Sequence, residues 1–77
     1  MKTIVSNQNI DQDLGMEIIG TLSSVFPEFV FAFDERTNSI KFDPAGNGGS
    51  RANVYIIQQK FFGFVLGYMW AKASKGV

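Results

Sequence analysis

The sequence predicts an α+β domain of two layers, in which two helices cover one face of a small antiparallel sheet. Near both ends of the chain, apolar residues recur at three- and four-residue steps, and between them they alternate with a period of two. The predicted element order is α-β-β-β-α. Because each element must bury its apolar side against another, two helices packed on one sheet is the natural arrangement. The 77 residues form one domain, 1–77.

The first helix is expected over residues 9–25. Asn9 is the expected N-cap, and Gln12 follows three residues later, as in a capping box. Pro27 ends the helix, because a residue that precedes proline avoids the α region. The predicted apolar stripe consists of Ile10, Leu14, Ile18, Leu22, Val25 and Phe26.

Residues 28–43 read as a β-hairpin. Apolar residues alternate on both sides of a polar turn over residues 35–38, which is a strong hairpin signal. One face of this hairpin should carry all the large side chains and meet the helices. That face consists of Phe29, Phe31, Phe33, Ile40 and Phe42.

The segment 53–58 has two interpretations. Its β-branched and aromatic residues favour a third strand, which is the preferred prediction, with the last helix over residues 60–74. The alternative is one long C-terminal helix from about residue 51 and an α-β-β-α order, since periodicity does not separate short apolar runs. Ile4 and Val5 are candidates for an additional edge strand.

The composition argues against an enzyme. The chain has no cysteine and no histidine, which excludes Ser-His-Asp and Cys-His catalysis, histidine-based metal sites and thiol redox chemistry. We expect no cofactor and no metal, because Asp34, Glu35 and Asp43 occupy a turn and a strand end, where water satisfies them. The apolar run 61–71 is shorter than the roughly 20 residues of a membrane span, and the start resembles no signal peptide. A cytoplasmic location is therefore expected.

The formal charge of zero hides an asymmetry. Residues 1–43 hold three basic and seven acidic residues, a net charge of −4, whereas residues 44–77 hold four basic and no acidic residues, a net charge of +4. The two halves either complement each other in the fold or leave a surface for an anionic partner. The loop 46–51 matches neither common phosphate-binding pattern. The candidate anion-binding residues are Arg51, Lys60, Lys72 and Lys75.

The last helix has more apolar surface than one small sheet requires. Its apolar arc spans about 200°, whereas a helix that covers a sheet needs slightly more than about 100°. Either the helix wedges between the first helix and the sheet, or one of its sides packs on a second molecule. Gly63 and Gly67 form a G-x-x-x-G pair, which allows close approach of the helix to its own sheet or to a partner.

We therefore expect a non-enzymatic protein-binding or inhibitor module that acts through its last helix and self-associates as a two-fold homodimer. Phages and mobile elements encode accessory proteins of this size that block a host enzyme or defence complex. The alternative function is nucleic-acid or anion binding by the basic half. The candidate partner-binding residues are Trp70, Tyr68, Phe64, Phe61 and Met69.

Overall fold

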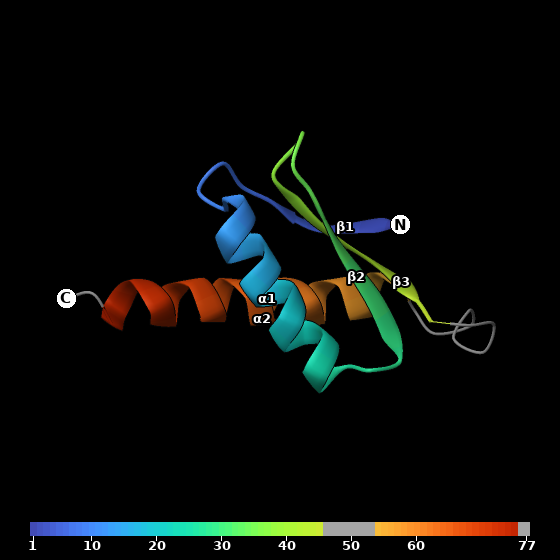
Figure 1. Cartoon of the computed structure of the whole chain (residues 1–77). Helices are drawn as coiled ribbons and strands as arrows, with labels where there is room; N and C mark the ends of the chain where they lie inside the picture. The colour runs from blue at the N-terminus through green and yellow to red at the C-terminus, as the bar shows by residue number, and fades with distance from the viewer. Residues whose placement is uncertain (46–53, 76–77) are drawn as a thin grey trace.

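The computed structural model describes residues 1–45 and 54–75. Within these ranges the chain forms a three-stranded antiparallel sheet and two helices, which confirms the two-layer α+β class (Figure 1). The strands lie in the order β1-β3-β2. The elements along the chain are β1 (Lys2–Ser6), α1 (Gln12–Val25), β2 (Phe29–Asp34), β3 (Ser39–Pro44) and α2 (Val54–Lys75).

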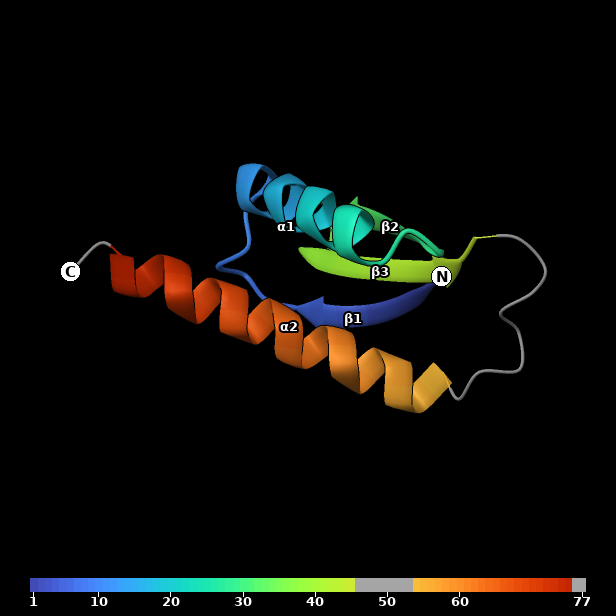
Figure 2. The same ribbon diagram turned by 90° about the horizontal axis from the view of Figure 1, so that it is seen from below.

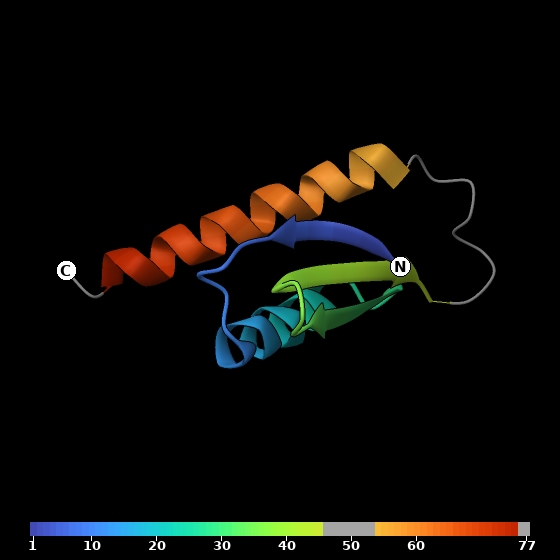
Figure 3. The same ribbon diagram turned by 90° about the horizontal axis from the view of Figure 1, so that it is seen from above.

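Both helices lie on the same face of the sheet, as predicted. Helix α1 packs mainly on β2, and α2 runs along β1 at the opposite edge (Figure 2). The view from the other side shows the strands in front of both helices (Figure 3). The C-terminal turns of α2 extend past the sheet, so this part of the helix has no strand beneath it.

Helix α1 begins later than the sequence indicates. Its N-cap is Asp11, whose Oδ1 accepts a hydrogen bond of 2.8 Å from the Leu14 amide, so the helix starts at Gln12. Asn9 was the wrong cap: its amide donates to the Asn7 side chain in the preceding turn. The predicted end is confirmed, because the helix stops at Val25, two residues before the proline.

The register of the hairpin places the predicted large side chains on one face. Phe31 lies opposite Phe42 and Phe33 opposite Ile40, so these large side chains share the face that meets the helices. Ring centroids of Phe29, Phe31 and Phe42 lie 5.1–5.3 Å from the ring of Phe61 on α2. The centre of the core is therefore an aromatic cluster between the hairpin and the last helix.

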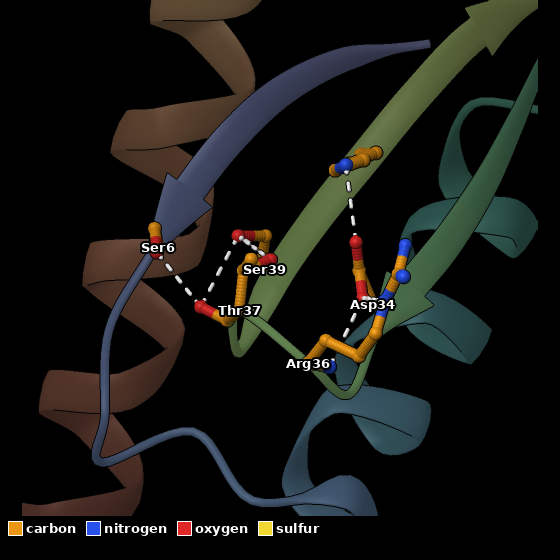
Figure 4. Close-up of polar contacts among 6 residues, drawn as sticks. Ser6, Asp34, Arg36, Thr37 and Ser39 are labelled. Carbon is orange, nitrogen blue, oxygen red and sulfur yellow. Dashed lines mark hydrogen bonds and ion pairs between the residues drawn. The ribbon is translucent and has the colours of Figure 1, made fainter.

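Polar contacts fix the turn between β2 and β3 (Figure 4). The Asp34 carboxylate accepts from the Arg36 amide at 3.0 Å and from Lys41 Nζ at 3.2 Å. The hydroxyl of Ser6, at the end of β1, donates to the Thr37 carbonyl at 2.9 Å, and this hydrogen bond connects the turn to β1. Asn38 ends the turn with φ of 51°, a left-handed conformation that asparagine tolerates.

The prediction of a strand at 53–58 is wrong. The alternative, one long C-terminal helix, describes the chain from Val54 onward. The third strand of the sheet is β1 (Lys2–Ser6), which pairs with β3 on the side opposite β2. The register of β1 shifts between Thr3 and Val5, and this bulge buries both Ile4 and Val5 although they are consecutive. Ile4 and Val5 thus belong to a full strand.

Candidate functional site

The side of α2 that points away from the sheet is apolar. Five large side chains on it are between 42% and 74% exposed, and Trp70 is the most exposed of them. Most of them follow one another at steps of three and four residues, with Gln59 filling the gap in the stripe. No formal charge lies along this stripe. We call it the exposed face of α2; it consists of Tyr55, Ile56, Phe62, Leu66 and Trp70.

The opposite side of the same helix provides the core contacts. Phe61 and Val65 are fully buried. Four further side chains pack partly against the core: Ile57, Phe64, Tyr68 and Met69. The sequence also allows α2 to wedge between the first helix and the sheet with both of its sides buried. The structure does not have this arrangement. The excess apolar arc faces outward.

The two glycines of the G-x-x-x-G pair lie on the outward side. Gly63 and Gly67 are both exposed, and a Cβ added at either one would meet no atom within 4 Å. Close packing of α2 on its own sheet therefore does not account for them. Each glycine in a helix interior costs about 1 kcal/mol relative to alanine, a cost that the packing of this fold does not require.

The predicted partner-binding residues divide between the two sides. Trp70 belongs to the exposed face, whereas Tyr68, Phe64 and Met69 are only partly accessible at its inner margin. Phe61 is 1% exposed at the centre of the core, which corrects its assignment as a contact residue.

Sequence reasoning missed four of the five residues of the exposed face. Tyr55 and Ile56 fall in the segment predicted as a strand, so they are not considered as helix residues. Phe62 and Leu66 are part of the apolar arc of the last helix, but the sequence does not show that they face outward. The signal was present, because positions 55, 59, 62, 66 and 70 already have helical spacing.

A polar contact joins the two helices on the side of α2 that faces α1. Lys72 Nζ on α2 lies 2.6 Å from both carboxylate oxygens of Glu17 on α1, and the Tyr68 hydroxyl donates to the same carboxylate. The hydrogen bond to Glu17 raises the pKa of Tyr68 above its ordinary value, because the phenolate would face a carboxylate. The same partner raises the pKa of Lys72 by favouring its charged form. This contact holds α2 against α1 and leaves the exposed face uncovered.

The candidate anion-binding residues do not form one site. Lys60 Nζ lies 5.4 Å from the centroid of the Phe26 ring, and Lys72 is bound to Glu17. Twelve residues separate these two lysines, a distance of about 18 Å along a helix. Arg51 and the loop 46–51 lie outside the described residues, and of Lys75 only the backbone is described, at the end of α2.

An open groove of about 520 Å³ lies between the start of α1 and the C-terminal turns of α2. Two of its three carboxylates serve the fold, since Asp11 caps α1 and Glu17 binds Tyr68 and Lys72; the third, Asp13, lies in the first turn of α1. No group of three potential metal ligands comes together in the described ranges. The residues that line the groove are Asn9, Asp11, Asp13, Leu14, Glu17, Met69, Lys72 and Ala73.

Across residues 1–45 and 54–75, neither helix combines the length and the apolar content that crossing a bilayer requires. Comparison of the chain with known protein families, with curated proteins and with solved structures found no match.

Proposed function

We propose that the protein is a non-enzymatic protein-binding module and that the exposed face of α2 is its contact surface. One observation carries the proposal: large apolar side chains, two of them more than 65% exposed, form one uncharged stripe on a helix. Contiguous apolar surface of this kind is unusual on a monomer and marks interaction sites. Tryptophan and tyrosine, at its two ends, are the residue types that most often dominate binding energy.

The chemistry of this face favours a protein over a nucleic acid. Binding to phosphates needs several cations on one surface, whereas Lys60 and Lys72 are far apart and Lys72 is bound to Glu17. A small-molecule site is usually concave and enclosed, whereas this surface is the outer side of a helix. It borders an open depression of about 270 Å³, where Tyr55 and Phe62 meet Ile4. A helix that presents an apolar stripe is a recurring way to fill a groove on a protein partner, which also suits an inhibitor of an enzyme or of a larger complex.

Capture with matched variants tests this proposal. Proteins retained by the wild-type chain from native lysate should be lost with Leu66→Lys and with Trp70→Ala, because both changes alter the exposed face of α2 without touching the core. The control is Met16→Lys, which places the same charge at a position on α1 that is 56% exposed. It should retain the same proteins as the wild type.

Two outcomes would contradict the proposal. One is a set of captured proteins that is the same for the wild type and for both α2 variants. The other is a capture that weakens steeply with salt while remaining insensitive to Leu66→Lys, because that behaviour indicates phosphate contacts. Circular dichroism of each variant establishes that the fold is intact before capture.

A further inference from the structure

We propose that the occupant of the exposed face of α2 is a second copy of this chain, bound through an antiparallel contact between the two α2 helices about a two-fold axis. This inference rests on the proposed function, since it names the partner of the same surface. A two-fold contact requires a surface that is complementary to itself. The exposed face of α2 has this property.

Apart from Ile56, the positions along the stripe are related in pairs about a point between Phe62 and Gly63. When two copies meet antiparallel around that point, Tyr55 of each lies level with Trp70 of the other. At the centre, the ring of Phe62 lies level with Gly63 of the second copy, so a large side chain meets a residue with none. The space above Gly63 is open in the single chain, which leaves room for that ring.

Electrostatics also favours an antiparallel pair. The five side chains of the exposed face carry no formal charge, and the whole chain has a net charge of zero, so two copies do not repel each other through their net charge. The nearest cation is Lys60, exposed at the border of the face three residues before Gly63. Antiparallel helices place the positive end of one dipole beside the negative end of the other. Gln59 and Leu66, which lie level in this register, bring no charge into the contact.

The area is sufficient for a dimer. Because a fully buried aromatic side chain covers 150–250 Å², the exposed fractions of this face amount to about 500 Å² on each copy. Two copies then bury about 1,000 Å², near the lower limit of specific interfaces. A small domain with no cysteine also gains stability that its own core does not supply.

Sedimentation of two matched glycine variants tests the contact. Gly63→Glu places a charge at the centre of the proposed interface. Gly20→Glu places the same side chain on the outer side of α1, where a Cβ also meets no atom within 4 Å. The wild type and Gly20→Glu should sediment at twice the monomer mass at micromolar concentrations. Gly63→Glu should weaken self-association about tenfold or more, because it places a long charged side chain where the apolar contact requires a residue without one.

Cross-linking tests the antiparallel register, since the chain has no cysteine of its own. A mixture of Gln59→Cys and Leu66→Cys should give a disulfide between the two variants, whereas neither variant alone should link to itself. Self-linking of each variant would indicate parallel helices and overturn the register. Ser24→Cys, exposed on α1, should not link in any mixture.

The failure of this inference differs from the failure of the proposed function. If the wild type remains monomeric up to millimolar concentration, a second copy of the chain does not occupy the exposed face of α2. If Leu66→Lys still abolishes capture in that case, the face binds a different protein and only the present inference is lost. If the chain is monomeric and capture is unaffected by Leu66→Lys, both are lost.

Discussion

The two helices lie on the same face of the same sheet, yet they differ in what they expose. Helix α1 buries one stripe, in which Ile18 and Leu22 are fully covered, and its outer side is largely polar. Helix α2 buries a comparable stripe around Phe61 and Val65, and its outer side is apolar as well. The sheet therefore demands one apolar stripe from each helix. The second stripe of α2 is not explained by the fold, and for that reason we propose that it binds a partner.

The glycines of the two helices follow the same division. In α1, a Cβ on Gly15 would lie 2.6 Å from the Phe33 ring, so the close approach of helix and strand requires glycine there. In α2, Gly63 and Gly67 face open space. A glycine that packing requires and a glycine that packing does not require should respond oppositely to substitution.

The largest effect on stability is expected on the core-facing side of α2. Phe61→Ala should lower the free energy of unfolding by about 3–5 kcal/mol, because it removes a ring that contacts four others. Its exposed neighbour should matter little to the monomer: Phe62→Ala should change stability by about 0.5 kcal/mol or less. Urea unfolding at low protein concentration measures both. Equal losses would show that the outer side is part of the core.

Substitution of glycine by alanine should have opposite signs in the two helices. Gly15→Ala should destabilise the protein by about 1–3 kcal/mol, because the added methyl group collides with the Phe33 ring. Gly67→Ala should stabilise the monomer by about 1 kcal/mol through helix propensity alone. Thermal unfolding of the two variants measures both changes in stability. A Gly67→Ala monomer that is less stable than the wild type would contradict the open space around this residue.

A smaller effect is expected where the helices touch through polar groups. Tyr68→Phe should cost about 1 kcal/mol, because the hydroxyl donates to the Glu17 carboxylate. Since this contact raises the pKa of Tyr68, its stabilisation is complete below about pH 10 and is lost as the pH rises through the raised pKa. Unfolding from pH 7 to 12 should show the wild type and Tyr68→Phe converging at high pH. A constant difference would contradict this reasoning.

The smallest effect is expected in the hairpin turn, far from α2. The Arg36 amide, and then Lys41, lower the pKa of Asp34 below its ordinary value. Its contribution to stability is therefore present above the ordinary aspartate pKa of about 3.9 and is lost as the pH falls through the lowered value. Asp34→Asn should flatten the acid limb of the stability profile between about pH 2 and 5. An unchanged acid limb would show that the carboxylate charge does not stabilise the turn.

Local patterns predicted the hairpin and the end of α1. Alternation placed Phe31, Phe42 and Ile40 on one face, and Pro27 stopped the helix where expected. The N-cap was misplaced by two residues, because Asn9 and Asp11 are both good caps and only the turn around Asn7 selects between them. The long-range pairing of β1 with β3 is beyond local patterns, and so is the choice of helix over strand for the residues from Val54.

Periodicity identifies the helix that has excess apolar surface, but it does not identify the residues that face outward. Among the five predicted contact residues, Trp70 is the one that lies on the exposed face of α2. Which side of the arc faces the core depends on the crossing of α2 over β1, and periodicity does not contain this information.

Helix α2 packs on β1, and this contact between elements far apart in the sequence has a consequence for the order of folding. β1 pairs with β3, and the Gln58 side chain on α2 donates to the Thr3 carbonyl, a contact between residues 55 positions apart. During synthesis β1 therefore leaves the ribosome before β3 and α2, and Ile4 lacks its contact with α2 until that helix has been made. We expect folding to be completed only after synthesis of α2, and to be slower than in a helical bundle of the same length. The nascent chain then depends on its last segment to cover its first.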